Sequence, residues 1–256
     1  MIRLTLRSSV LFFALVLGGF GQSWSGFYIG ADAGGFKGNS NAFTSTIFSP
    51  TGYFALSSVP AIATVGNQPL SPRGFTGSGT VGYNFQHNHW VLGFEGDFGV
   101  MHINDDFTGS ATYPCCAPTT FTITQKVSSD WLLTVRPRVG LTNGPVLVYG
   151  TGGLAMTNFN YSENFIDTFA TAHESARMSG TLTGWTGGGG VEFKIGSGNH
   201  WSLKAEYLWI DFGSGLKTTS TNLTAFTPPI AFPTNVFTHQ ADLNGSLARG
   251  GFNYRF

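Results

Sequence analysis

Apolar and polar residues alternate along eight stretches of this 256-residue chain. A period of two is typical of a strand with one apolar and one polar face, whereas the apolar residues of a helix recur every three or four positions. The last stretch is the clearest, because Phe252, Tyr254 and Phe256 alternate with Asn253 and Arg255. The pattern predicts strands over residues 25–36, 74–86, 90–102, 129–141, 146–157, 183–195, 201–212 and 243–256.

The connections between these predicted strands alternate between short and long. Three are short and carry Asn or Gly, which favour tight turns, at residues 87–89, 142–145 and 196–199. The other four, at residues 37–73, 103–128, 158–182 and 213–242, are rich in Thr, Ser, Asn, Phe and Pro. Short turns on one side and long loops on the other are typical of outer-membrane barrels, and an even number of strands places both termini on the side of the short turns.

Composition separates a membrane barrel from a soluble β-sandwich, which also has alternating strands. Charged residues make up only 10% of the chain, against roughly 25% in a soluble domain. A sandwich would carry charges on its outer faces, whereas here the faces opposite the polar ones carry aromatic residues near strand ends. Such residues are typical of the membrane interface, and the tryptophans in these places are Trp90, Trp131, Trp185, Trp201 and Trp209. The predicted fold is therefore all-β, an eight-stranded antiparallel up-and-down transmembrane β-barrel with short periplasmic turns and four long extracellular loops.

The N-terminus has the features of a secretory signal peptide. Arg3 and Arg7 precede an apolar run over residues 10–20, and small residues follow. The run is shorter than the about 20 residues that a membrane helix needs, although an N-terminal anchor helix is the alternative interpretation. We expect a signal peptide over residues 1–23, export through the Sec pathway, and a barrel domain over residues 24–256.

Several stretches resemble the small porin-like outer-membrane β-barrel proteins of alphaproteobacteria, surface antigens of the opacity-protein type. They are "WSGFYIGADAGG", "GYNFQHNHWVLGFEGDF", "RPRVGLTNGPVLVYGTGGLA", "WTGGGGVEF", "WSLKAEYLWIDFG" and the terminal "FNYRF". The resemblance covers all eight predicted strands and implies the outer membrane of a Gram-negative cell. It also implies that Phe252, Tyr254 and Phe256 form the signal that the barrel-assembly machinery reads. A simpler interpretation is that these rings lie at the lipid interface, and the two are compatible.

The predicted strands turn eleven charged side chains toward the interior of the barrel. They are Asp32, Glu95, Asp97, Glu192 and Glu206, with Arg136, Arg138, Lys194, Lys204, Arg249 and Arg255. An eight-stranded barrel is about wide enough for side chains to fill, and a buried unpaired charge costs several kcal/mol. Neighbouring strands bring Glu95 and Asp97 to Arg136 and Arg138, Glu192 and Lys194 to Lys204 and Glu206, and Arg249 or Arg255 to Asp32. The same residues suit a salt-bridged plug or a polar conduit for small ions or solutes.

Candidate catalytic and cofactor sites are weak. The triplet His173, Glu174 and Ser175 offers a Ser/His pair as in a lipid-modifying barrel, but it falls in a predicted loop where nothing fixes its geometry. The six histidines are scattered, and His87 and His89 in one turn do not make a metal site. We therefore expect no enzyme, no cofactor and no metal.

Two further features of the predicted loops remain open. Haem capture by loops, which is known among relatives in the family that this chain resembles, is compatible with His173 or His239. Cys115 and Cys116 are adjacent and fit ordinary disulfide geometry badly, although the expected compartment is oxidising.

The expected function is an envelope-structural and surface-contact role, with a lumen plugged by salt bridges. A porin-like diffusion channel is the alternative, and a haem-binding or lipid-modifying barrel is a less favoured one. The expected partners are outer-membrane lipid and lipopolysaccharide, the assembly machinery during insertion, and a host or envelope surface ligand bound through the aromatic loops, because loops on a rigid scaffold often carry binding. Formal charges cancel, so no basic face for nucleic acid is expected.

Overall fold

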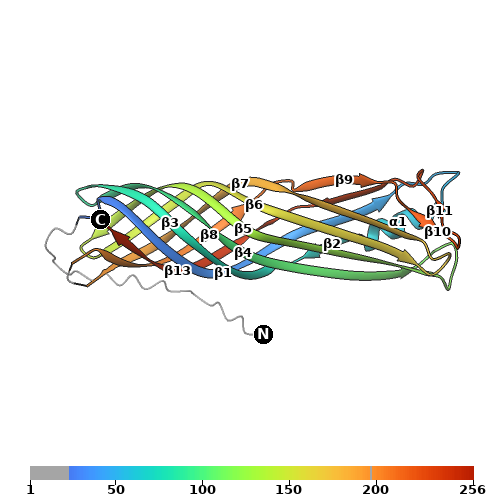
Figure 1. Ribbon diagram of the computed structural model, residues 1–256, viewed down its shortest axis with the longest axis horizontal. Coiled ribbons are helices and arrows are strands. Elements are labelled where there is room, and N and C mark those ends of the chain that lie inside the picture. The colour runs from blue at the N-terminus through green and yellow to red at the C-terminus, as the bar shows by residue number, and fades with distance from the viewer. Residues whose placement is uncertain (1–22, 197) are drawn as a thin grey trace, which may run out of the picture.

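Eight long strands close into one antiparallel ring in the computed structural model, which describes residues 23–196 and 198–256 (Figure 1). The predicted signal peptide lies outside the described residues, Ser23 excepted. Each strand pairs with the next along the chain, and the last pairs with the first. In ring order the strands are β1 (Gly26–Thr46), β3 (Arg73–His87), β4 (Trp90–Thr112), β5 (Thr120–Asn143), β6 (Val146–Asp167), β7 (His173–Ile195), β8 (Trp201–Asp211) and β13 (Asn244–Arg255). The predicted eight-stranded barrel is confirmed.

Three tight turns lie at one end of the barrel, where sequence predicted them. They connect β3 to β4, β5 to β6 and β7 to β8. Asn88, Gly144 and Asn199 adopt positive φ angles of 53°, 59° and 56° in these turns, a conformation that Gly and Asn tolerate best. The C-terminus lies at the same end (Figure 1), which we call the turn end.

The prediction of four long loops is wrong in extent, because the strands continue through much of each predicted loop. Shorter strands complete the wall at the far end: β2 and β12 pair with β1, and β9 pairs with β12. One short helix, α1, lies among the remaining connections. The bounds of these elements are β2 (Asn67–Leu70), β9 (Leu216–Ser220), β10 (Thr224–Ala225), β11 (Ile230–Ala231), β12 (Phe237–Ala241) and α1 (Ser58–Val65).

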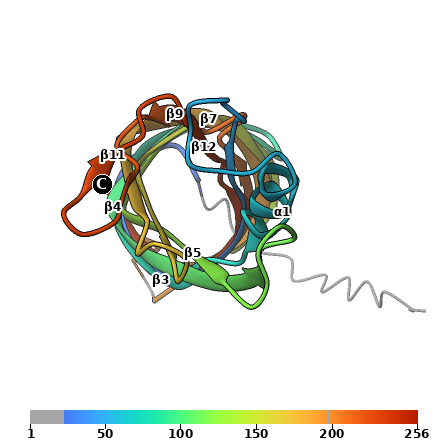
Figure 2. The same cartoon turned by 90° about the vertical axis from the view of Figure 1, so that its right-hand side faces the viewer.

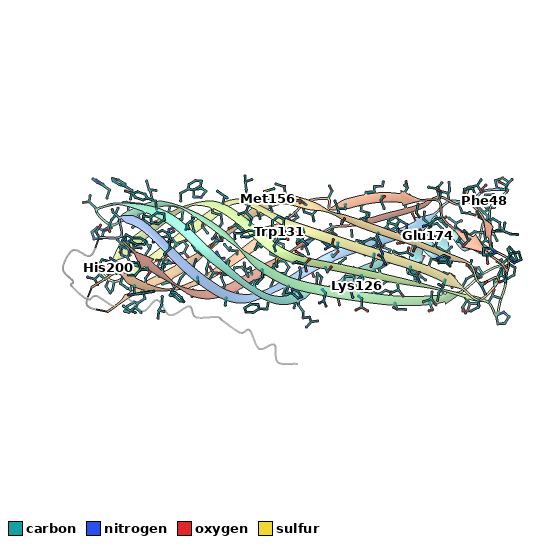
Figure 3. All side chains as sticks on the ribbon, viewed as in Figure 1. Phe48, Lys126, Trp131, Met156, Glu174 and His200 are labelled. Carbon is teal, nitrogen blue, oxygen red and sulfur yellow. A yellow bond between two sulfur atoms is a disulfide. The ribbon has the colours of Figure 1, made fainter. Side chains whose placement is uncertain are left out.

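The outward face of the wall changes from apolar to polar along each long strand. On β4, Phe98 and Val100 are 62% and 53% exposed, and they are the last of a run of outward apolar residues that starts at Trp90. That run matches the about 9–11 residues that a tilted strand needs to cross a membrane. Beyond it, polar residues such as Asn104 and Thr108 face outward. We call the outward apolar zone the belt and the wall beyond it the shaft. Figure 3 places Trp131 near this boundary and Lys126 in the shaft.

The inward face changes in the opposite sense at the same level. Glu95 and Asp97 point inward within the belt, and Met101 and Ile103 follow them inward in the shaft. On β5 the register shifts between residues 128 and 132. Before the shift the inward-facing residues are odd-numbered, as Val127 is, and after it they are even-numbered, as Leu132 is. Such a switch is expected where a bulge adds a residue to one strand. Each level of the wall therefore has one apolar face, toward lipid in the belt and toward the interior in the shaft. Within the described part of the chain, no helix has the length and apolar character needed to cross a membrane.

A compact cap closes the end of the barrel away from the turns, and we call it the head. It comprises α1, β10, β11 and the connections at residues 47–66, 113–119, 168–172 and 221–236. Viewed end-on, α1 lies at the rim, inside the outline of the wall (Figure 2). Phe54 and Ile62 from this part pack with Phe121, Phe165 and Phe237 from the strand ends in one buried apolar cluster. The head is therefore packed onto the shaft and shares a core with it.

Candidate functional site

The interior of the belt contains all eleven charged residues singled out from the sequence. Each is buried, and none is more than 7% exposed. They come from β1, β4, β5, β7, β8 and β13, so the acids and bases face one another across the lumen as well as along neighbouring strands.

Arg136 is the centre of this network. Its guanidinium lies 2.8 Å from Glu95, 2.6 Å from Asp97 and 3.1 Å from Glu206, and its side chain is fully buried. The planar fork of Arg suits contact with several carboxylates at once. Because Arg136 stands on β5 and Glu206 on β8, one of these ion pairs crosses the lumen.

Arg249 and Lys204 add further contacts across the lumen. Arg249 lies 2.6 Å from Glu206, 3.1 Å from Asp97 and 3.1 Å from Asp32. The amino group of Lys204 lies 3.4 Å from both Asp32 and Glu95. Strands β8 and β4, which carry Lys204 and Glu95, stand opposite each other in the ring. The lumen at this level is filled by paired charges.

Some pairings differ from those expected from neighbouring strands. Glu192 lies 2.6 Å from Arg138 on β5, although its register partner on β8 is Lys204. Lys194 makes no ion pair with Glu206 in the described salt bridges. It instead donates a hydrogen bond of 2.6 Å to the Ser23 carbonyl and lies 4.7 Å from the centre of the Trp24 ring.

The turn end of the lumen is closed by Trp24, a residue whose inward position was not evident from the sequence. Its side chain is fully buried, and it packs with Val91, Leu147 and Tyr149. Arg255 lies over the same ring as Lys194, also 4.7 Å from its centre. A cation over a Trp face is attracted to the ring quadrupole. Lys194 and Arg255 therefore hold this ring in place.

Two tyrosines complete the charged zone and also escaped the sequence analysis. Tyr28 donates a 2.8 Å hydrogen bond to Glu95, and Tyr149 donates one of 3.0 Å to Glu206. Their rings lie over Gly82 and Gly190, where any side chain would overlap the phenol. The signal that was available is the glycine on a neighbouring strand, which leaves room for a large inward side chain.

An apolar layer follows the charged zone inside the shaft. It comprises buried side chains from every side of the wall, including Met101, Leu132, Leu182, Leu208, Ile210, Phe212, Leu243 and Leu247. Such a layer leaves charges and water no polar partner. The interior is therefore closed twice, first by paired charges and then by hydrocarbon.

A buried polar cluster separates this apolar layer from the core of the head. It consists of Glu163 on β6, Glu174 on β7 and His239 on β12, each with one ligand atom within 4.8 Å of the others. Nε2 of His239 lies 3.6 Å from Glu174 Oε1, and Nδ1 lies 3.9 Å from Glu163 Oε2. This set could not be found from the sequence, because strand register alone brings the three residues together.

The placement of two candidate sites, the triplet at residues 173–175 and His239, is corrected here. His173, Glu174 and Ser175 lie on β7 and not in a loop, so their side chains alternate: Glu174 is buried while His173 and Ser175 are exposed on the outer face. His173 contacts Thr224 at 3.2 Å and makes no hydrogen bond with Ser175 among the described contacts. His239 is fully buried on a strand and offers no exposed loop ligand for haem.

The two carboxyls of the cluster differ in their tendency to hold a proton. Burial, together with the hydrogen bond and the negative charge of Glu174, raises the pKa of Glu163 to about 10. Burial also raises the pKa of Glu174, but hydrogen bonds from His239, Glu163 and Ser220 outweigh it and hold that pKa below its ordinary value. Without another cation, Glu163 therefore holds a proton and Glu174 carries the charge.

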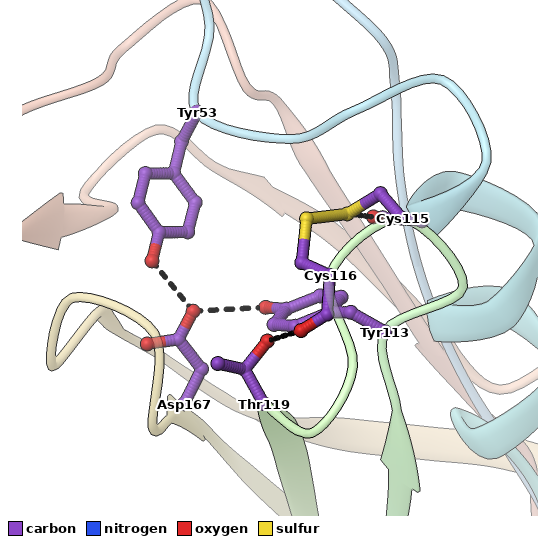
Figure 4. Close-up of a disulfide and its surroundings, with 7 residues drawn as sticks. Tyr53, Tyr113, Cys115, Cys116, Thr119 and Asp167 are labelled. Atoms are coloured by element: carbon purple, nitrogen blue, oxygen red, sulfur yellow. Dashed lines mark hydrogen bonds between the residues drawn. A yellow bond between two sulfur atoms is a disulfide. The ribbon is translucent and has the colours of Figure 1, made fainter.

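The head contains a small aromatic pocket beside a disulfide (Figure 4). Cys115 and Cys116 are bonded to each other. With Tyr53, Tyr113 and Phe169 they line a cavity of about 140 Å³. Both tyrosines donate to Asp167, at 2.6 and 3.0 Å, and burial raises the pKa of each phenol above its ordinary value.

The head also exposes large apolar side chains. They are Ile47, Phe48, Leu56, Phe169, Phe226 and Ile230, each between 44% and 69% exposed. Tyr53 contacts Phe169 and Phe226 edge-on, with ring centres 6.1 and 6.3 Å apart. Phe48 lies at the extreme end of the molecule (Figure 3).

The aromatic residues expected at the interface face outward at the two edges of the belt. Trp90 and Trp201 begin their strands at the turn end, and Trp131, Trp185 and Trp209 lie toward the shaft. Phe252 and Phe256 of the terminal strand are 48% and 67% exposed, and Tyr254 packs between Trp201 and Phe256. An antiparallel ring with an apolar belt and aromatic edges defines a transmembrane β-barrel of the outer-membrane class.

Comparison with known proteins identifies the family. The chain belongs to the outer membrane protein beta-barrel domain family, whose model matches residues 9–256, and it is a protein of the outer membrane. It is 32% identical over 193 residues to a 31 kDa outer-membrane immunogenic protein of Brucella melitensis, covering 75% of this chain and 72% of the relative. It is 31% identical over 141 residues to a 22 kDa outer membrane protein of Rhizobium leguminosarum, covering 55% and 54%.

Among solved structures, the outer membrane protein OprG of Pseudomonas aeruginosa matches 91% of this chain and 96% of its own, with 12% identity and a TM-score of 0.42. Neisserial surface protein A matches 91% and 98%, with 17% identity and a TM-score of 0.34.

Proposed function

We propose that this protein is a non-conducting outer-membrane barrel whose function is to hold a rigid, apolar-tipped head outside the membrane for contact with other surfaces. The observation that carries the proposal is the succession of closed layers along the interior: Trp24, the paired charges, the apolar layer and the core of the head. A diffusion pathway would have to pass all four.

Two further features support the surface-contact role. The head shares its core with the shaft, so its position relative to the membrane is fixed by packed side chains. Its tip carries several large apolar residues that are about half exposed, and exposed apolar patches of this kind commonly mark interaction sites.

Conductance of the folded barrel in a planar bilayer tests the first half of the proposal. The folded state is checked beforehand by the heat-dependent shift of its band on a gel. We expect no steady current from the wild-type barrel. A steady current whose ion preference changes in Arg136→Ala would favour the diffusion channel and overturn the proposal.

Adhesion of whole cells to hexadecane droplets tests the second half, with hydrocarbon as the probe for an apolar contact surface. Cells that display the wild-type protein should adhere more than cells that display Phe48→Ser, Leu56→Ser, Phe226→Ser and Ile230→Ser in combination. A matched control changes outward-facing polar shaft residues, Thr108→Ala and Thr122→Ala, and should leave adhesion unchanged. Equal adhesion of the wild-type and head variants would show that the tip makes no such contact.

A further inference from the structure

Glu163, Glu174 and His239 lie inside the shaft between two buried apolar clusters. On each strand the inward neighbours belong to apolar clusters: Tyr161 and Phe165 flank Glu163, and Phe237 and Ala241 flank His239. Hydrocarbon therefore encloses the three groups on both sides. Two carboxyl groups in such a place are costly unless something pairs with them.

Protein side chains provide only part of that pairing: His239 and Ser220 contact Glu174, and without another cation Glu163 shares a proton with Glu174. Glu163 is 3% exposed, and neither of its carboxylate oxygens has a hydrogen-bond donor among the described residues. Glu174 Oε2 also has none. In the described salt bridges, each carboxylate has only His239 as a basic partner, at 3.9 and 3.6 Å. Unpartnered oxygens thus point into a space that an imidazole also faces.

We propose that Glu163, Glu174 and His239 bind a divalent transition-metal ion, with Zn²⁺ as the representative ion. Two carboxylate oxygens and one imidazole nitrogen form a ligand set that such ions accept. Two negative charges and a neutral imidazole are balanced by one divalent cation. This site is independent of the proposed surface-contact function.

The geometry requires only small side-chain movements. Two ligands at about 2.1 Å from a tetrahedral ion are roughly 3.4 Å apart. The imidazole nitrogen Nε2 lies 3.6 Å from Glu174, close to that value, whereas the 3.9 Å distance to Glu163 runs to the other ring nitrogen, Nδ1. One ion binds a single ring nitrogen, so one of the two carboxyl groups must rotate toward the nitrogen that the other already faces. The ligand atoms of the whole set lie within 4.8 Å, so side-chain rotation brings them together without moving the strands.

Neighbouring polar side chains are placed to support the ligands. Ser220 donates a hydrogen bond to Glu174 Oε1, and its oxygen lies 3.2 Å from His239 Nε2. Thr44 lies 3.1 Å from His239 Nδ1, and Gln125 donates to the same Thr44 hydroxyl at 3.1 Å. Partners of this kind orient metal ligands and fix which ring nitrogen is free. Rotation of Ser220 would leave room for a water as a further ligand.

Ser220 stands beside a stretch of the wall where no strand ladder joins β7 to β9 in the described part of the chain. In the strand pairs of the described chain, β7 has no ladder with β9, and over residues 174–184 its edge on that side has no strand partner. Ser220 on β9 is partly exposed. Ser220, which contacts Glu174, is therefore a partly exposed neighbour of the cluster at a stretch of the wall without a continuous ladder among the described strands.

Titration of the folded full-length barrel in detergent with Zn²⁺ tests the site, with isothermal calorimetry for stoichiometry and Co²⁺ visible absorption for the ligand geometry. We expect one ion per barrel. Glu163→Gln and His239→Gln should each weaken binding by at least about 100-fold, since loss of an outer-shell partner alone typically costs 10–100-fold. His173→Gln is the matched control, because it removes an exposed histidine next to Glu174 and should leave binding unchanged.

Two results would overturn the proposal. One is a folded wild-type barrel that binds no Zn²⁺, in which case Glu163 and Glu174 share a proton instead. The other is Zn²⁺ binding of equal strength in wild type and Glu163→Gln, which would place the ion elsewhere. His239→Gln is not essential to the test. If that variant does not fold, the stoichiometry of the wild type and the affinity of Glu163→Gln, which preserves side-chain shape, still decide whether the ion binds at this site. Neither result bears on conductance or on the apolar tip.

Discussion

Replacing Arg136 with Met removes the charge at the centre of the lumen while preserving most of the side-chain volume. Breaking a buried ion pair by removing one partner costs about 3–5 kcal/mol. The contacts of this network place Arg136→Met at the lower end of that range. Glu95 retains Arg138 at 3.3 Å and Lys204 at 3.4 Å, so no carboxylate that Arg136 contacts is left without a cation. We expect a loss of about 3 kcal/mol in the free energy of unfolding.

Adding Arg249→Met makes the loss greater than the sum of its parts. Asp97 and Glu206 each have Arg136 and Arg249 as their cationic contacts within the described salt bridges. In the double variant Glu206 retains only the Tyr149 hydroxyl, and Asp97 only two threonine hydroxyls. Residues in one network typically show coupling energies of about 0.5–3 kcal/mol, and we expect a value in the upper half of that range.

Urea unfolding of the barrel in lipid vesicles, followed by tryptophan fluorescence and the gel shift, measures both quantities. Lys126→Met on the same strand is the matched control, because Lys126 is exposed on the outer face of the shaft. Its expected effect is within about 0.5 kcal/mol. If Arg136→Met is no more destabilising than Lys126→Met, or if the double variant is additive, the charged zone does not stabilise the barrel as reasoned here.

Three other perturbations test separate features. Trp24→Ala should lower the free energy of unfolding by about 3–5 kcal/mol, as for other buried aromatic truncations, and an effect below 1 kcal/mol would mean that the ring does not close the turn end. In a variant with Cys115→Ser and Cys116→Ser, a fluorophore on a cysteine at Phe98 should be quenched by brominated lipid and one at Asn104 should not; equal quenching would misplace the boundary of the belt. Phe256→Ser should reduce the amount of folded barrel in the outer membranes of cells while the purified chain refolds as well as wild type, and an equal loss in both settings would make the terminal ring a lipid anchor only.

The belt was predictable from the sequence because two independent patterns agree there. Alternation gives the strands, and the short turns at residues 87–89, 142–145 and 196–199 give their order. The outward position of Trp90 and Phe98 follows from the same alternation. The membrane requires an apolar outer face, so polarity alone assigns the two sides of each strand.

The shaft was missed because the rule for assigning the two sides reverses there. Phe121, Ile123 and Val127 alternate with Thr122 and Thr124 as regularly as the residues of the belt, but their apolar side faces inward. A sequence rich in Thr and Ser between two barrel strands resembles a loop when only the membrane rule is applied. The alternation of apolar and polar residues was present in these segments, and it indicated a strand regardless of which face was buried.

The polar cluster was beyond sequence reasoning for a different reason. Glu163, Glu174 and His239 lie on three strands, and only the register of β6 with β7 and the place of β12 as a strand of the wall bring them together. One local signal was available: Glu163 follows Tyr161 and precedes Phe165 on the same face. A single acid in an apolar row marks a buried charge, but not its partners.

The arrangement of polarity gives the polar cluster its significance. In the belt, the outer face must be apolar, so the polar residues of each strand are confined to the interior, and the structure balances their charges with one another. In the shaft, water surrounds the wall, and the interior is free to be apolar throughout. Glu163 and Glu174 depart from that arrangement where the fold does not require it, and no Arg or Lys faces them in the described salt bridges. Two carboxyl groups in such a place are costly unless a cation pairs with them, and that is the role that the proposed divalent ion would fill.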